Sequence, residues 1–228
     1  MEPFLTVVSG LAWTIVYIAA IRVGFRHKTY AIPMAALALN LAWETTYAVR
    51  DLTAAVSPQG VINAVWALAD LVIVYTFFAF GRAEFPRFVT RAMFVVFGAV
   101  VFGASYVVQW MFIAEYGELD AARYSAFLQN LLMSGLFIAM FVARRGLRGQ
   151  TLTIAVAKCL GTLAPTILIG AIRDVPFILG LGILCGVFDL VYIGLVVWAK
   201  RHPDAFAAAD APAPGPVIEI PGQRAAAA

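Results

Sequence analysis

Long apolar segments separated by short polar connections make up most of the sequence. Seven of them have the length of about 20 residues that a helix needs to cross the hydrocarbon core of a bilayer. These segments span 4–24, 30–48, 61–80, 91–113, 123–143, 151–170 and 177–199. Because the connections are short, we expect consecutive helices to pack as antiparallel neighbours. The pattern predicts an all-α membrane protein whose residues 1–200 form a compact bundle of seven transmembrane helices.

Two places depart from this pattern. Residues 201–228 are rich in alanine and proline and have no hydrophobic periodicity, so we expect a disordered tail there. Pro165 falls inside the sixth span, where proline removes a backbone hydrogen bond. We therefore expect that helix to be kinked.

The composition agrees with a membrane protein. Hydrophobic residues make up 63% of the 228 and charged residues 13%, about half the share of charged residues in a typical soluble protein. This balance excludes a water-soluble globular protein and a disordered chain. Two cysteines, both in apolar spans, are too few for a disulfide scaffold.

Basic residues are distributed unevenly between the two sides of the predicted bundle. Twelve of the sixteen follow the first, third, fifth and seventh spans, whereas only Arg50, Arg123 and Arg173 lie on the other side. The positive-inside rule then places the N-terminus outside and the C-terminus, with its tail, in the cytoplasm. The net charge of +3 thus reflects topology, so we expect contact with membrane lipid and no nucleic-acid partner.

Three carboxyl groups lie within the spans, at Glu44, Asp70 and Asp189. In lipid such groups must be paired or must serve a function. Helical spacing places Asn40 on the face of Glu44, and Trp66 on the face of Asp70. We expect Glu44 near the outer end of its helix and the two aspartates at mid-depth. All three would then line one cavity that opens toward the outer half of the membrane.

Carboxyl groups in such a cavity permit several functions. A low dielectric disfavours the charged form, and a neutral carboxylic acid can protonate an alkene or an epoxide. Aromatic faces nearby would stabilise the resulting cation. The same acids would also serve a proton relay, or would pair helices together. Lys158, halfway along the sixth span, either extends to the interface or pairs with an acid.

No aspartate-rich run for magnesium and no cluster of histidine and cysteine occurs in the sequence, so we expect neither a metal nor a cofactor.

Three short motifs resemble those of the small integral-membrane terpene cyclases, known from fungal meroterpenoid and bacterial drimentine-type indole-terpenoid pathways. The motifs are Asn40-Leu-Ala-Trp43-Glu44, Trp66-x-x-x-Asp70 and Phe188-Asp189-x-x-Tyr192. The resemblance covers the seven spans and excludes the tail. It implies a metal-independent, protonation-initiated cyclisation of a prenyl chain, farnesyl in the drimentine-type enzymes, on an indole or other aromatic core.

The resemblance also implies roles for individual residues. The two acids essential in that family fall on Glu44 and Asp189, one delivering the proton and the other holding it in position. We expect the substrate, a lipophilic prenylated small molecule, to contact Asn40, Trp43, Tyr47, Trp66, Asp70, Tyr106, Gln109, Trp110, Gln129, Asn130, Phe188 and Tyr192. The alanine- and arginine-rich composition favours a bacterial cell membrane.

A proton-coupled small-solute transporter or a seven-helix sensor is the alternative, because either would use the same buried acids. Transporters typically carry inverted repeats and discontinuous helices. Neither is clear in this sequence. The sequence carries no signal for an oligomeric state.

Overall fold

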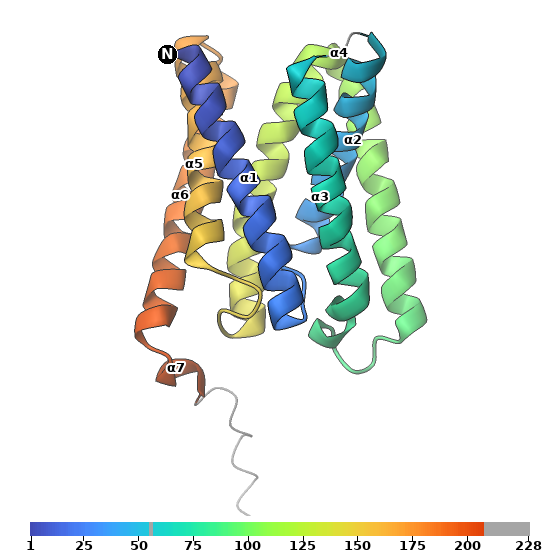
Figure 1. Ribbon diagram of the computed structural model, residues 1–228, viewed down its shortest axis with the longest axis vertical. Helices are drawn as coiled ribbons and strands as arrows, with labels where there is room; N and C mark the ends of the chain where they lie inside the picture. Colours follow the sequence, from blue (N-terminus) through green and yellow to red (C-terminus); the bar gives the residue numbers. More distant parts are fainter. Residues whose placement is uncertain (55–56, 208–228) are drawn as a thin grey trace, which may run out of the picture.

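The computed structural model describes residues 1–54 and 57–207, and over these ranges the protein is all-helical. The elements, shown in Figure 1, are α1 (Glu2–His27), α2 (Met34–Ala54), α3 (Pro58–Phe80), the 3-10 helix η1 (Gly81–Glu84), α4 (Arg91–Arg144), α5 (Leu152–Pro165), the π-helix η2 (Thr166–Ile172), α6 (Pro176–Arg201) and α7 (Asp204–Ala207). The predicted tail begins with the end of α6 and with α7. Its residues 208–228 lie outside the described residues.

Each predicted span falls on a helix, and two of them share α4. They meet at Gly117, whose φ of +71° and ψ of 173° break the helix. A positive φ suits glycine because it has no Cβ to clash with the backbone. The two halves of α4 consequently run antiparallel to each other (Figure 1).

The end of α2 differs from the prediction. The helix continues to Ala54, past the predicted end at 48, so Glu44 lies near its middle and not near its outer end. Hydropathy marks where apolar residues stop, but the backbone remains helical through Arg50, whose guanidinium pairs with Glu118 of α4.

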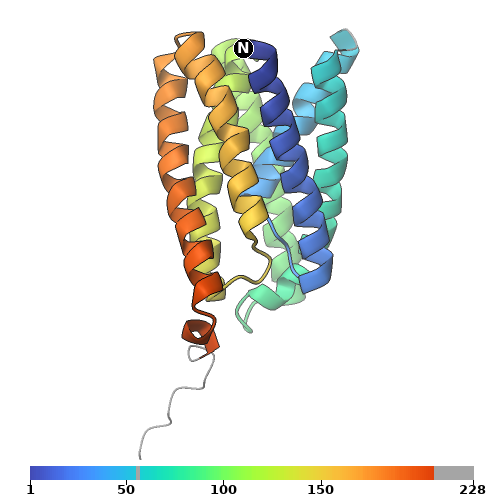
Figure 2. The ribbon, with the colours of Figure 1, turned by 60° about the vertical axis from the view of Figure 1, so that its left-hand side comes forward.

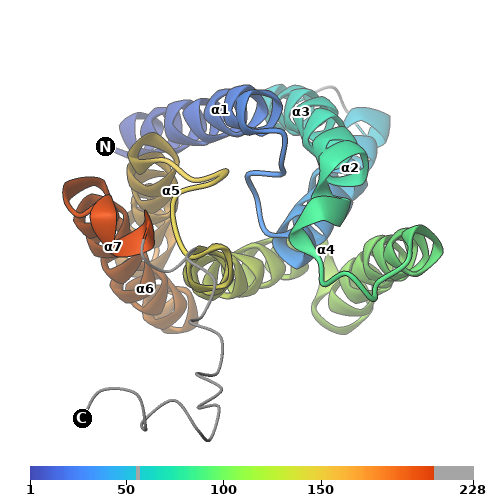
Figure 3. The same cartoon turned by 90° about the horizontal axis from the view of Figure 1, so that it is seen from below.

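Six segments form a closed ring. In this ring α1 packs on α3 and α5, α2 packs on α3 and α4, and α6 packs on α4 and α5. Figure 2 shows α6, α5 and α1 side by side, and Figure 3 shows the ring from below. The half of α4 before Gly117 lies outside the ring (Figure 3).

The expectation that all consecutive helices are neighbours is wrong for α1 and α2, because α1 lies between α3 and α5. It is also wrong for the second half of α4 and α5, because α6 lies between them. The connection between α1 and α2 crosses the end of the ring (Figure 3), where Ala31 and Ile32 are buried in the core.

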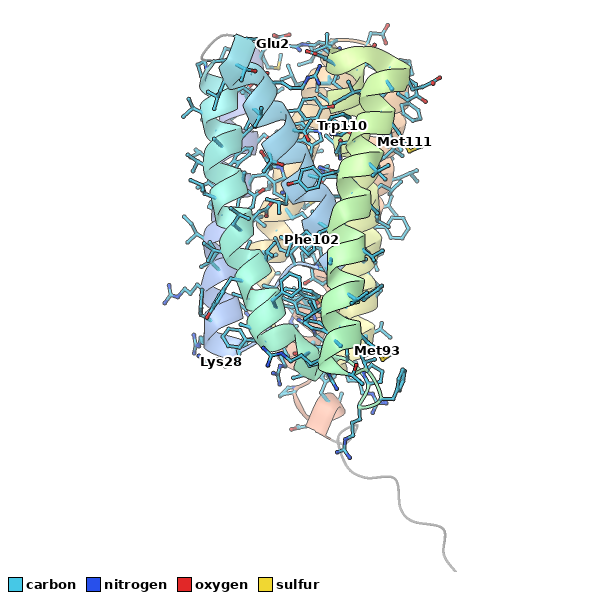
Figure 4. The ribbon with its side chains drawn as sticks, turned by 90° about the vertical axis from the view of Figure 1, so that its right-hand side faces the viewer. Glu2, Lys28, Met93, Phe102, Trp110 and Met111 are labelled. Atoms are coloured by element: carbon cyan, nitrogen blue, oxygen red, sulfur yellow. The ribbon has the colours of Figure 1, made fainter. Side chains whose placement is uncertain are left out.

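The half of the ring nearest α7 is packed solidly. Its core includes Phe77, Phe137, Ile154, Tyr192 and Val196, all fully buried. The outer surface is apolar instead of polar, as the exposed side chains of Met93, Trp110 and Met111 illustrate (Figure 4). Apolar groups face outward because lipid, unlike water, does not penalise them.

Within residues 1–54 and 57–207, five segments are long and apolar enough to cross a membrane: Glu2–His27, Pro58–Glu84, Arg91–Arg144, Leu152–Ile172 and Pro176–Arg201. At Pro165, where the sequence predicts a kink, regular α-helix ends and the wider π-helix η2 follows. With their apolar outer surface, these helices indicate an integral membrane protein.

Candidate active site

A cavity of about 470 Å³ lies inside the ring, in the half nearer the N-terminus. Its walls come from α1, α2, α3, the second half of α4, α5 and η2. This size is within the range of small-molecule sites, about 300–1,000 Å³. Gln59, Arg123 and Arg173 lie on the cavity wall toward the end of the bundle where α1 begins, and Tyr17 and Glu44 lie at mid-bundle, next to the packed half.

Aromatic side chains form much of the cavity wall. The indoles of Trp13, Trp43 and Trp66 all line it. Trp43 Nε1 donates to the carbonyl of Ala122 at 3.0 Å, and Trp66 Nε1 donates to Thr14 Oγ1 at 3.2 Å. These bonds fix the polar edges of the rings. Aromatic faces can attract a cation, so the wall suits a ligand that becomes positively charged.

A hydrogen-bonded group of four side chains forms the inner end of the cavity. Asn40 Nδ2 donates to Asp70 Oδ2 at 2.9 Å and to the hydroxyl oxygen of Tyr17 at 2.5 Å. The Tyr17 hydroxyl in turn donates to Glu44 Oε1 over 3.5 Å. Glu44 is only 4% exposed, and its Oε2 has no hydrogen-bond partner within residues 1–54 and 57–207.

The sequence builds this group in a simple way. Asn40 and Glu44 are four residues apart, so they share one face of α2. Asp70 comes from α3, which packs against α2, and Tyr17 comes from α1, which packs against α3. Asp70 is fully buried behind the cavity wall and contacts the group through Asn40.

Asp189 is not part of this group. Its Oδ1 lies 2.7 Å from Lys158 Nζ, which also donates to Ser134 Oγ at 2.6 Å. This cluster joins α4, α5 and α6, and none of its members lines the cavity. Of the three carboxyl groups expected to line one cavity, only Glu44 does so. Lys158 adopts the alternative in which it pairs with an acid.

The other predicted contact residues divide into three groups. Asn40, Trp43, Trp66, Gln129 and Asn130 line the cavity. A second group lies behind its wall: Tyr47 packs on Trp43 with ring centroids 4.8 Å apart, and Gln109 donates to Gln129 Oε1 at 3.4 Å.

The third group lies away from the cavity. Tyr192 is buried in the packed half, where it donates to Gln150 Oε1 at 3.0 Å. Tyr106 and Trp110 lie on the outer half of α4, and Phe188 faces outward from α6. Phe188 directly precedes Asp189, and successive side chains of an α-helix point about 100° apart. Because Asp189 is buried in the interior, Phe188 points away from it.

The sequence prediction missed several wall residues, above all Trp13, Tyr17, Gln59, Arg123 and Arg173. Part of the signal was present in the sequence. Leu5, Ser9, Trp13 and Tyr17 recur every four residues, which places them on one stripe of α1.

The two cavity arginines already have acidic neighbours. Arg173 Nη2 lies 3.1 Å from Glu2 Oε2, and Arg123 Nη1 lies 3.6 Å from Asp120 Oδ1. Surface ion pairs of this kind contribute little stability, about 0–1 kcal/mol. A guanidinium also has five N–H donors, so each arginine has further donors to offer a ligand.

An aromatic-lined cavity with a buried acid, set in an apolar helical ring, is suited to binding an apolar small molecule within a membrane protein. The sequence profile of the Pyr4-like transmembrane terpene cyclases matches residues 1–175, a range that includes every cavity-lining residue and ends before Asp189. The chain belongs to this family of terpene cyclases. The predicted family and enzyme class are confirmed, in place of the transporter or sensor alternative.

Named relatives agree with the family match. The Pyr4-family terpene cyclase mfmH of Annulohypoxylon moriforme is 28% identical over 170 residues, covering 71% of this chain and 67% of its own. The terpene cyclase pyr4 of Aspergillus fumigatus is 25% identical over 210 residues, covering 86% and 85%. The terpene cyclase ascF of Acremonium egyptiacum is 29% identical over 169 residues, covering 68% and 61%.

No solved structure matches the chain. The relatives named above are fungal, so they give no support to the bacterial cell membrane inferred from composition.

Proposed function

We propose that this terpene cyclase starts its reaction by protonating the end of a prenyl chain, and that Glu44 is the donor. The observation that carries the proposal is the position of Glu44. It is a buried carboxyl group at the inner end of an aromatic-lined cavity, with one oxygen, Oε2, unpaired within the described part of the chain. A carboxyl group removed from water favours its neutral form, which has a proton to give.

The proposed reaction is an isomerisation. The proton of Glu44 adds to the terminal alkene, forming a C–H bond, or to a terminal epoxide oxygen, where a C–O bond then breaks. The carbocation closes onto internal double bonds, and loss of a proton from the last cation ends the sequence. One proton enters and one leaves, so this route needs neither a metal nor a cofactor. The indoles of Trp13, Trp43 and Trp66 stabilise the cations and keep water away from them.

We infer the orientation of the substrate from the two ends of the cavity. A prenyl chain, farnesyl or of similar length, lies along the aromatic wall with its end toward Glu44. Its indole or other aromatic core lies near Gln59, Arg123 and Arg173, where guanidinium donors meet carbonyl or phenolic oxygens. A lipophilic substrate of this kind partitions into the bilayer that surrounds the enzyme.

The same proposal includes the topology. Each half of α4 crosses the membrane, and α2 crosses as a member of the ring, which gives seven spans. The N-terminus lies outside and the C-terminus in the cytoplasm. In support, the described basic residues that follow alternate spans gather at the end of the bundle nearest α7, away from Arg123 and Arg173.

We assign Asp189 a supporting part. The carboxyl group of Asp189 is occupied by Lys158 Nζ, 2.7 Å away, and the pair lies behind the cavity wall. Lys158 and Ser134 are each one helical turn from a wall residue, Thr162 and Asn130 respectively. The pair therefore fixes the helices that carry part of the wall.

The test is turnover of a farnesylated indole or aromatic substrate by detergent-purified protein. Glu44→Gln keeps the shape of the side chain and removes the acid, so product formation should fall by about 10²–10⁴-fold. Glu115→Gln, the same change at an exposed position on α4, should leave turnover unaltered. Wild-type turnover by folded Glu44→Gln protein would refute Glu44 as the donor.

A further inference from the structure

Tyr17 lies between the two carboxyl groups at the inner end of the cavity. It contacts Glu44 directly and Asp70 through Asn40. We propose that Tyr17 is a positioning residue that keeps the proton of Glu44 on Oε2, the oxygen that has no hydrogen-bond partner in the described ranges. This inference rests on the proposed function of Glu44 and adds a residue that sequence reasoning did not find.

A series of hydrogen bonds runs from Asp70 through Asn40 and Tyr17 to Glu44. Asp70 Oδ2 accepts from Asn40 Nδ2 at 2.9 Å, so the nitrogen of the amide faces Asp70. The same Nδ2 carries a second hydrogen, which it donates to the Tyr17 hydroxyl oxygen at 2.5 Å. Asp70 thereby fixes Asn40 as a donor toward Tyr17.

The hydroxyl of Tyr17 must then donate in another direction. It has a single hydrogen, and Glu44 Oε1, 3.5 Å away, is its acceptor. In a neutral carboxylic acid the carbonyl oxygen is the better acceptor, so this bond favours the proton of Glu44 on Oε2. That oxygen has no other partner in the described ranges 1–54 and 57–207.

The hydrogen bond from Tyr17 also stabilises the ionised form of Glu44. Once Glu44 has given up its proton, the bond from Tyr17 becomes charge-assisted, and such bonds are shorter and about twice as strong as neutral ones. Hydrogen bonds of active sites are often long in the free enzyme and tighten during the reaction. Tyr17 therefore favours the carboxylate that proton transfer produces.

The hydroxyl can be removed without disturbing the packing. Tyr17 is buried, and its ring stacks on Trp66 with centroids 5.9 Å apart. Tyr17→Phe keeps this ring and deletes only the O–H group. A role limited to packing would survive the change, whereas a role in positioning the proton would not.

The experiment compares Tyr17→Phe with Tyr75→Phe, which makes the same change on the outward face of α3. We expect Tyr17→Phe to lower kcat about 10- to 100-fold with KM unchanged, because one donor to a developing charge is lost. The unfolding temperature should fall only slightly, since two buried hydrogen bonds are lost but the ring packing is kept. The solvent deuterium isotope effect on kcat should rise as proton transfer becomes slower. Tyr75→Phe should match the wild type in all four measurements.

Two results would overturn the inference. One is a kcat within twofold of the wild type for Tyr17→Phe, and the other is a change confined to KM, which would assign Tyr17 to substrate binding. Glu44→Gln, measured in parallel, separates the two proposals. If Glu44→Gln is inactive while Tyr17→Phe is fully active, only the role of Tyr17 fails; if Glu44→Gln is active, the proposed function fails as well.

A double-mutant cycle tests the path through Asn40. Asn40→Leu removes the donor that orients Tyr17, so Tyr17→Phe combined with Asn40→Leu should lower kcat no further than the more severe single variant. Multiplicative losses would show that the two side chains act independently, against the proposal.

Discussion

Lys158 and Asp189 form an ion pair with 2.7 Å between Nζ and Oδ1, and both side chains are almost completely buried. The two residues come from α5 and α6, and Ser134 of α4 accepts a further bond from Lys158. Charges in such a site depend on each other, because neither has water to solvate it.

Removing one partner should therefore cost more than removing both. We expect Asp189→Leu alone and Lys158→Met alone each to destabilise the protein by about 3–5 kcal/mol, since one uncompensated charge remains. The double variant should recover most of the unfolding temperature, because apolar side chains of similar volume replace a buried pair at little cost. Thermal unfolding in detergent measures this.

The activity of the double variant distinguishes a structural role of Asp189 from a role in the reaction. If Asp189 only holds the helices, cyclisation should return along with stability. A double variant that is stable but produces no cyclised product would show that Asp189 takes part in proton transfer.

The indole wall gives a prediction about both rate and product. Replacing Trp43 or Trp66 with leucine should lower turnover by about 2- to 30-fold, the equivalent of a cation–π contribution of about 0.5–2 kcal/mol. Partly cyclised products should also increase, because cations that lose stabilisation are deprotonated earlier. Trp198→Leu is the control for loss of an indole, because Trp198 lies near the C-terminal end of α6, away from the cavity. An unchanged rate and product mixture would contradict a role for the wall.

The arginines of the cavity should affect binding more than chemistry. Arg123→Gln and Arg173→Gln are expected to raise KM with little change in kcat, because both lie away from Glu44. Arg201→Gln, at the far end of α6, serves as the matched control. Steady-state kinetics on substrates with and without an oxygen acceptor on the aromatic core would check this. Equal KM values for the variants and the wild type would remove the arginines from substrate recognition.

A stability prediction concerns the contact of η2 with α6. A Cβ placed on Gly170 would lie 2.7 Å from the Cα of Leu179, so Gly170→Ala forces two backbones apart. The expected cost is about 1–3 kcal/mol, as for other overpacked sites. Gly180→Ala is the control, since a Cβ there meets nothing within 4 Å. Equal unfolding temperatures for the two variants would contradict this packing.

Much of this architecture could be predicted from the sequence. Apolar length alone located the helices, and the four-residue spacing of Asn40 and Glu44 placed both at the cavity. Glu44 was detectable because a carboxyl group in an apolar helix needs a reason to be there.

The orientation of the helices could not be predicted in the same way. In water a polar face identifies the outside, but lipid and protein interior are both apolar, so hydrophobicity does not separate Trp110 on the surface from Trp43 in the cavity. Asp189 was misplaced for a related reason. Its partner, Lys158, comes from another helix. Only the packing of the helices into a ring determines whether a carboxyl group lies beside a basic side chain or faces the cavity.

On the orientation proposed above, the packed core on the α7 side of Glu44 would limit the length of prenyl chain that the cavity accommodates. A chain with its aromatic core near Arg123 and its end at Glu44 would have the packed core that includes Phe77 on the α7 side of its end. An isoprenoid with one unit too many would have to fold back or leave its aromatic core outside. On the proposed orientation, a substrate with a longer prenyl chain should therefore be cyclised more slowly than a farnesylated one.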